Sequence, residues 1–167
     1  MRPSPYSYHL ITGPCIKTFL SLALALLHRI SPTTHREKTA SDPAYVSLRM
    51  IPGPGCGSSY VGNVTARPFV ENGVQHLNIS NEDCLKDRVL WHELWHAFGF
   101  FHEQSRPDRD DFVKINVGNI VPGLEGNFRI ARGSLTFGLP YDGRSFMHYS
   151  SRAFSRTGAG PTIESKV

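Results

Sequence analysis

The chain is best understood from one segment, Trp91-His92-Glu93-Leu94-Trp95-His96-Ala97-Phe98-Gly99-Phe100-Phe101-His102. On a helix, His92 and His96 stand about 40° apart in azimuth and about 6 Å apart along the axis, so two imidazoles can reach one ion. Gly99 permits the turn that brings His102 round as a third ligand. Three protein ligands leave the fourth position of a zinc ion open, which is typical of a catalytic rather than a structural zinc site.

Glu93 follows the first predicted ligand directly and can face a water molecule on the ion, as a general base must. The alternative is a buried, aromatic-rich core helix with incidental histidines. Three core histidines would each need a polar partner, whereas one zinc ion serves all of them. The segment therefore predicts His92, His96 and His102 as metal ligands and Glu93 as a catalytic residue.

The charge of the chain is concentrated near its start. Residues 1–40 hold five Lys/Arg and one Glu, whereas residues 41–167 hold thirteen residues of each sign. The domain expected over residues 41–167 is therefore neutral, which argues against a nucleic-acid partner. A structural zinc module that binds nucleic acid is disfavoured by this balance and by the open ligand set.

Residues 1–40 are expected to be a leader or possible signal segment followed by a linker. The apolar run Phe19–Leu27 follows Lys17 and is long enough for the hydrophobic part of a signal peptide, but too short to span a bilayer. His28–Pro32 is a poor cleavage site, so two interpretations stay open: an export signal, or sequence that is not native to the mature protein. No stable membrane span is expected.

Short strands and one long helix are predicted for the rest of the chain. Ser80–Asp83 offers helix-capping side chains, and Gly99 is expected to end the helix that carries the histidines. Residues 118–140 are rich in Asn, Gly and Pro and predict irregular structure. Strands are expected at residues 45–50, 59–62, 75–80 and 112–117.

Three cysteines, Cys15, Cys56 and Cys84, leave one thiol over if two of them pair. Cys56 and Cys84 bracket the segment that leads into the predicted zinc helix. A disulfide between them is favoured over two buried free thiols, since the possible signal segment points to an oxidising compartment.

The chain resembles the astacin family of zinc metallopeptidases in two stretches, His92 to Asp110 and Ser145-Phe146-Met147-His148-Tyr149. Glu103 directly after the third histidine separates astacins from matrixins, which carry Ser there, and from reprolysins, which carry Asp. The resemblance covers about residues 44 to 165. It implies an α+β, metzincin-like fold: a small twisted mixed sheet over the zinc-binding helix, and a loop-rich C-terminal half.

The resemblance also implies roles for residues outside the zinc segment. Ser145–Met147 would form a tight turn in which Met147 packs beneath the zinc without ligating it. Tyr149 would be a second catalytic residue, near the metal, that helps to hold the developing oxyanion. Glu103 resembles the glutamate that pairs with the mature amino terminus. The expected peptidase domain over residues 41–167 is truncated at both ends. The chain ends at Val167, before the stretch that closes the lower half of the family's cleft, and the strand and helix that open the family's domain are not recognisable in the sequence.

The expected function is that of a secreted, extracellular zinc-dependent endopeptidase, which hydrolyses peptide bonds in polypeptide substrates through a zinc-activated water. The strand containing Leu77–Ile79 is expected at the cleft edge, where an extended substrate adds as another strand. The alternative is a catalytically impaired zinc-binding fragment that acts as a binding or decoy module. The sequence does not determine the oligomeric state.

Overall fold

The structure is a computed structural model that describes residues 6–10, 35–52, 56–68, 70–81, 84 and 87–166. The chain forms two compact units, Met1–Gly99 and Phe100–Val167, and each is described by itself. The apolar run Phe19–Leu27 lies outside the described residues, as do the last two residues of the expected capping segment Ser80–Asp83.

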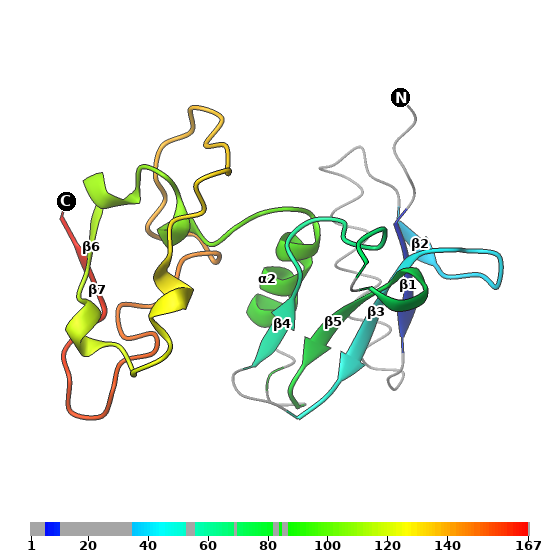
Figure 1. Cartoon of the computed structure of the whole chain (residues 1–167), viewed down its shortest axis with the longest axis horizontal. Helices are drawn as coiled ribbons and strands as arrows, with labels where there is room; N and C mark the ends of the chain where they lie inside the picture. The colour runs from blue at the N-terminus through cyan, green and yellow to red at the C-terminus, as the bar shows by residue number, and fades with distance from the viewer. Residues whose placement is uncertain are drawn as a thin grey trace. The chain divides into compact units, whose positions relative to one another are not determined.

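The first unit contains a five-stranded mixed sheet with the strand order β2-β1-β3-β5-β4 (Figure 1). Every neighbouring pair is parallel except β4 and β5, which are antiparallel. Strands β1 and β2 come from the range expected to be a leader and linker. The strands are β1 (Tyr6–Leu10), β2 (His35–Glu37), β3 (Tyr45–Met50), β4 (Gly57–Ser59) and β5 (Val74–Ile79).

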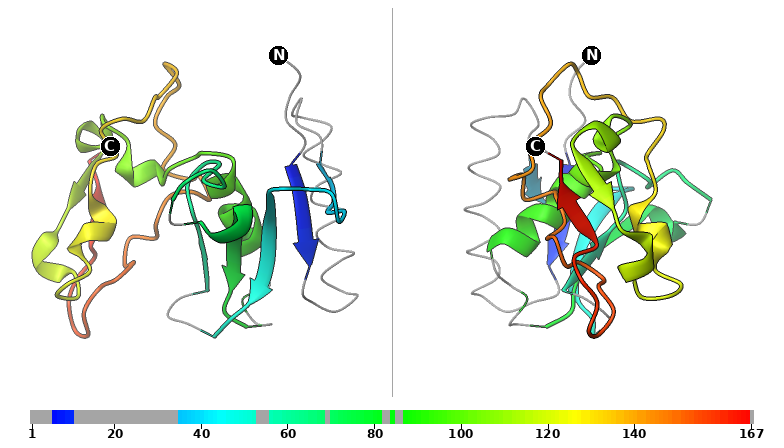
Figure 2. Two further views of the ribbon diagram at one scale, coloured as in Figure 1. Left: turned by 45° about the vertical axis from the view of Figure 1, so that its right-hand side comes forward. Right: turned by 90° about the vertical axis from the view of Figure 1, so that its left-hand side faces the viewer.

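One face of this sheet is covered by the helix α2 (Asp87–Ala97), as Figures 1 and 2 show. Alternate residues of β5 are buried, and Leu77 of β5 is paired with Leu48 of β3. Leu90 and Leu94 of α2 pack against them. The buried side chains of the strands and the leucines of the helix therefore form one core. The predicted mixed sheet over the zinc helix is confirmed.

The position of β5 corrects one expectation. The strand containing Leu77–Ile79 pairs with β3 on one side and β4 on the other, so it lies inside the sheet and not at its edge. Among the described strands, β4 ends the order instead. It begins two residues before the predicted strand at residues 59–62 and ends at Ser59, because residues 57–59 are the ones that pair with β5.

A disulfide joins Cys56 to Cys84, which confirms the predicted pairing. It connects the residue before β4 to the segment that leads into α2, across a sequence separation of 28. Closing a loop of this length stabilises the fold by about 3.5 kcal/mol in the chain-entropy model. The bond therefore ties the edge strand to the start of the helix.

Helix α2 ends at Ala97, and Gly99 adopts a positive φ of 103°. The amide of Gly99 donates to the carbonyl of His96 at 2.9 Å, and the amide of Gly62 donates to the same carbonyl at 2.8 Å. Because a left-handed backbone is open to glycine at little cost, Gly99 ends the helix as predicted. No helix among the described residues is long and apolar enough to cross a membrane.

The second unit is built mainly from turns and loops around a small core of Val113, Ile120, Phe128 and Ile163. Its two short strands, β6 (Val113–Ile115) and β7 (Ile163–Ser165), pair antiparallel (Figure 2). The predicted loop-rich C-terminal half is thereby confirmed. The other helical turns of the described residues are η3 (Glu103–Ser105), η4 (Arg109–Asp111), η5 (Val117–Asn119) and η6 (Glu125–Phe128) in this unit, and η1 (Glu71–Gly73) in the first unit.

Candidate metal centre and catalytic residues

Helix α2 presents two imidazoles one turn apart. The Nε2 atoms of His92 and His96 lie 3.1 Å apart, and the rings are edge to face with centroids 4.6 Å apart. Two nitrogens bound tetrahedrally to one zinc ion at about 2.0–2.1 Å would lie roughly 3.3 Å from each other. The pair therefore fits two adjacent ligand positions of such an ion. His96 is buried and His92 is half-buried.

Glu93 lies between these histidines in sequence and is only 5% exposed. Its Oε2 atom is buried and has no hydrogen-bond partner. Burial raises the pKa of the Glu93 carboxyl to about 7. An unpartnered buried carboxyl costs folding free energy, and such groups occur where chemistry requires them.

Gly57 of β4 provides the space in which the Glu93 side chain lies. A Cβ atom at Gly57 would stand 2.7 Å from Oε1 of Glu93 and 2.8 Å from its Cγ. Both distances are shorter than a real Cβ contact allows. The edge strand and the helix therefore meet so closely that only glycine at position 57 accommodates this carboxylate position.

The second unit places His102 and Tyr149 side by side. Their ring centroids are 4.3 Å apart, with the planes tilted by 55°. Tyr149 also contacts Phe128 and Phe154, with centroids 5.8 Å and 5.4 Å away. The ring of Tyr149 is thus held among aromatic side chains next to the predicted third ligand.

The turn predicted at Ser145–Met147 is present in the second unit. The amide of His148 donates to the carbonyl of Ser145 at 3.0 Å, and the amide of Met147 donates to Ser145 Oγ at 3.1 Å. The carbonyl of Met147 accepts from the amide of Glu103 at 3.1 Å. Met147 is 5% exposed. The turn is therefore fastened to the residue that follows His102.

Glu103 is an internal anchor of the second unit. Its Oε1 atom accepts from Nη1 of Arg106 at 3.0 Å and from the amide of Asp142 at 2.9 Å. Arg106 also donates to both carboxylate oxygens of Asp108, at 2.8 and 2.9 Å. These contacts join the segment after His102 to the segment before the Met147 turn.

Two positioning residues, Gln104 and Arg109, have no role in the sequence-based prediction. Gln104 is fully buried, and its Oε1 atom accepts from the amide of Tyr149 at 2.9 Å. Arg109 is buried and donates from Nη1 to the carbonyls of Gln104 and Phe128, at 2.9 and 2.8 Å. Both residues lie in the segment that follows His102, but two of their partners, Tyr149 and Phe128, are distant from them in sequence.

The predicted site residues are divided between the two units. His92, Glu93 and His96 lie together on α2 in the first unit, whereas His102, Met147 and Tyr149 belong to the second. His102 follows Gly99 by three positions in the chain.

Comparison with known proteins gives consistent matches over this chain. A family model described as Astacin, a peptidase family, matches residues 2–167. Zinc metalloproteinase nas-14 of Caenorhabditis elegans is 44% identical over 128 residues, which are 75% of this chain and 24% of that protein. Meprin A subunit beta of Mus musculus is 44% identical over 125 residues, which are 74% of this chain and 16% of that protein.

Solved structures agree with the fold. High choriolytic enzyme 1, a hatching enzyme zinc-protease from Oryzias latipes, is similar with a TM-score of 0.82 and 28% identity, covering 98% of this chain and 77% of that one. Myroilysin is similar in fold, with a TM-score of 0.67, 20% identity, and coverage of 95% of this chain and 85% of that one. The chain spans a quarter or less of the length of nas-14 and meprin A subunit beta.

Proposed function

The chain belongs to the astacin family of zinc metallopeptidases, and from this premise we propose that it hydrolyses peptide bonds within polypeptides. The observation that carries the proposal is the grouping on α2: a buried carboxylate oxygen of Glu93 without a partner, next in sequence to two imidazoles whose Nε2 atoms lie 3.1 Å apart. A core helix with incidental histidines does not require this unpartnered carboxyl.

His92, His96 and His102 would hold one zinc ion as neutral imidazoles, the set of ligands that the sequence predicts. When bound, zinc supplies Lewis acidity that polarises a carbonyl and lowers the pKa of a water molecule toward about 7. His102 would join the two residues of α2 because the chain turns at Gly99 and only Phe100 and Phe101 then intervene.

Glu93 would act as the general base. Its unpartnered Oε2 accepts the proton of the attacking water and later delivers it to the leaving amine nitrogen. The hydroxyl of Tyr149 would donate a hydrogen bond to the oxygen on which negative charge develops. Gln104 holds the backbone of Tyr149, so the phenol would be positioned before the substrate arrives.

The edge strand β4 would receive the substrate. An extended polypeptide can add to a sheet edge through backbone hydrogen bonds, and β4 ends the strand order in the described part of the chain. The Cys56–Cys84 disulfide next to this strand supports a secreted, extracellular location, because such bonds persist in oxidising compartments.

Chelation tests the proposed activity directly. The 167-residue chain with one equivalent of zinc is expected to cleave casein, to stop when a zinc chelator such as phenanthroline is added, and to recover with added zinc. An inhibitor of serine peptidases serves as the control and should have no effect. Stoichiometric zinc binding without chelator-sensitive cleavage would contradict the proposal and favour the alternative of a binding or decoy module.

Tyr149→Phe tests the proposed oxyanion donor. The variant keeps the ring that contacts His102, so zinc binding and the melting temperature should not change. Loss of the hydroxyl should lower kcat by about 10²-fold with little change in KM. Tyr45→Phe in β3 is the matched control. Equal loss of activity in both variants would argue against a specific role for Tyr149.

Gly57→Ala tests whether the space beside Glu93 sets the position of its carboxylate. The new Cβ would displace the end of a flexible side chain, so folding should survive while the carboxylate moves. A misplacement of about 1 Å can lower the rate about 10²-fold. Gly118→Ala, where a Cβ meets nothing within 4 Å, is the control. Unchanged kcat in Gly57→Ala would show that Glu93 does not depend on this contact.

A further inference from the structure

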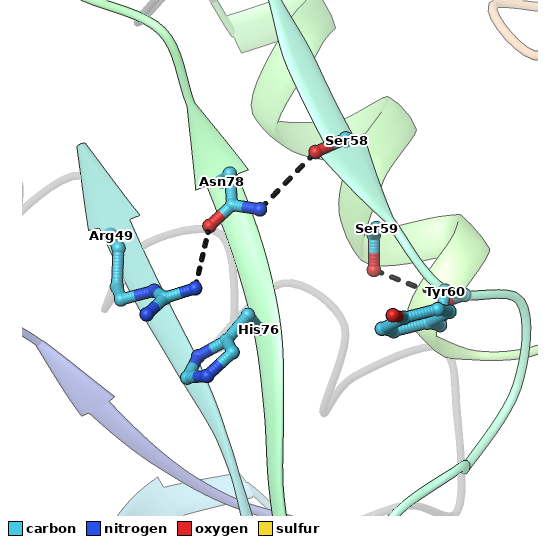
Figure 3. Close-up of a pocket in the computed structure, with 6 residues that line it drawn as sticks. All are labelled: Arg49, Ser58, Ser59, Tyr60, His76 and Asn78. Atoms are coloured by element: carbon cyan, nitrogen blue, oxygen red, sulfur yellow. Dashed lines mark hydrogen bonds between the residues drawn. The ribbon is translucent and has the colours of Figure 1, made fainter. Parts of the chain in front are cut away.

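The sheet face opposite α2 contains a polar pocket that the proposed peptidase mechanism does not use (Figure 3). Arg49 and Asn78 are register partners in β3 and β5, and Ser58 of β4 is the partner of Asn78 on the other side. Their neighbours Leu48 and Leu77 point to the core under α2. The pocket has a volume of about 350 Å³ and is lined by Arg49, Ser58, Ser59, Tyr60, His76 and Asn78.

A row of hydrogen bonds crosses the three strands at this pocket, as Figure 3 shows. Nη2 of Arg49 donates to Oδ1 of Asn78 at 3.3 Å, and Nδ2 of Asn78 donates to Oγ of Ser58 at 3.2 Å. The side-chain amide of Asn78 thus fixes the guanidinium of Arg49 with one contact and donates its own N–H to Ser58. Arg49 retains further N–H groups for a ligand.

Two nitrogen atoms in the pocket lack partners. Nε of Arg49 and Nδ1 of His76 are buried, and neither has a hydrogen-bond partner. Among the described residues, no carboxylate forms an ion pair with Arg49. Leaving a charged donor buried and unpaired is costly, so Nε of Arg49 requires an acceptor that the described residues do not supply. Nδ1 of His76 requires one as well in the tautomer that is protonated on this atom.

The electrostatics of the pocket select the kind of ligand. Burial lowers the pKa of His76, the charge of Arg49 lowers it further, and Glu71 opposes both. A guanidinium remains protonated, so a metal cation is repelled from this place. An apolar ligand would leave both unpartnered nitrogens unsatisfied. An oxyanion supplies acceptors and neutralises the charge of Arg49.

We propose that the pocket formed by Arg49, His76, Asn78 and Ser58 binds one oxyanion, either a carboxylate or a phosphate group. The guanidinium of Arg49 pairs with the anion through Nε, and the His76 imidazole, as the tautomer protonated on Nδ1, donates a second hydrogen bond. Tyr60, whose side chain lies at the same pocket, is 48% exposed, so the site opens to solvent.

Two sources of the oxyanion fit this placement. Ser58 belongs to β4, the edge strand, so a polypeptide lying along that edge passes the pocket and can offer an acidic side chain. A free phosphate ion enters from solvent without any strand pairing. The oxyanion site itself does not depend on peptidase activity, so its test is made by binding alone.

The first arm of the test is a titration of the 167-residue chain with inorganic phosphate at constant ionic strength. Binding is measured by calorimetry and by the shifts of the NMR resonances of the His76 imidazole. Saturable binding is expected, and Arg49→Gln should weaken it at least about 10-fold, because a charge-assisted hydrogen bond is lost. Lys114→Gln removes the same charge from an exposed position of β6 and should leave phosphate binding unchanged.

The second arm replaces phosphate with a short peptide that carries glutamate, compared with the same peptide carrying glutamine. If phosphate binds in an Arg49-dependent way and the peptides do not, the natural ligand is a free anion. If the glutamate peptide binds more tightly than the glutamine peptide, the ligand is a carboxylate of a polypeptide. Binding of neither ligand, or equal weakening in Arg49→Gln and Lys114→Gln, overturns the proposal.

Circular dichroism and thermal unfolding establish that the variants are folded. If Arg49→Gln does not fold, Arg49→Lys and the parental chain decide the question. Lysine keeps the positive charge but lacks the planar set of N–H donors of a guanidinium. The affinity of Arg49→Lys for phosphate should therefore be lower than that of the parental chain but still measurable. His76 resonances that do not move in the parental chain with either ligand overturn the proposal without any variant.

Discussion

Glu93→Gln is expected to abolish casein cleavage while leaving one zinc ion bound. The amide is nearly isosteric with the carboxylate and fits the same space beside Gly57, but it cannot accept a proton from water. A positioned general base contributes about 10²- to 10⁴-fold, so kcat should fall by that factor. The measurements are steady-state cleavage rates and the zinc content of the purified variant.

The control for this variant is Glu164→Gln, which makes the same chemical change on an exposed strand residue in β7. The melting temperature of Glu93→Gln should not be lower than that of the parental chain, because the substitution removes an ionisable group whose Oε2 is buried and unpartnered. Cleavage at the parental rate would show that the proton acceptor is another group. Loss of zinc together with activity would mean that Glu93 supports the metal instead.

His96→Ala is expected to remove both zinc and activity. His96 is the more deeply buried of the two imidazoles on α2, and its Nε2 lies 3.1 Å from that of His92. Even the loss of a residue that only orients a ligand lowers metal affinity about 10- to 100-fold, so the loss of a ligand should cost at least about 100-fold. Zinc content after dialysis and the cleavage rate measure the two effects.

A stability readout separates loss of metal from loss of fold in this variant. A ligand at about 100 times its Kd stabilises the native state by about 2.7 kcal/mol, so added zinc should raise the melting temperature of the parental chain. The shift should disappear in His96→Ala and persist in His35→Ala, a substitution of a histidine in β2. If His96→Ala keeps full zinc affinity, the assignment of the ligands is wrong.

The zinc helix illustrates how much of this protein is encoded locally. The spacing of His92 and His96, the burial of Leu90 and Leu94, and the end of the helix before Gly99 all depend on residues within a few turns of each other. Helical geometry is the same wherever such a segment occurs. The histidine pair and the end of the helix were therefore predictable before any contact with the sheet was known.

The sheet shows where local pattern is insufficient. Alternation predicted the strands Tyr45–Met50 and Val74–Ile79 within a residue of their bounds, but not that β5 lies between β3 and β4. Strand order depends on pairing between residues far apart in the chain, and a buried alternating strand looks alike at the edge and in the interior. The expected edge position of Leu77–Ile79 failed for this reason.

The functional side chains also show a difference between what local sequence encodes and what tertiary packing decides. Residue types and spacing were sufficient to nominate His92, Glu93 and His96, because ligand chemistry and helical periodicity are local. That Oε2 of Glu93 is unpartnered beside Gly57, that Gln104 holds Tyr149, and that Arg49 meets His76 and Asn78 were decided by tertiary packing. Each of these contacts joins segments whose approach is set by strand register and core burial, which no short stretch of the chain specifies alone.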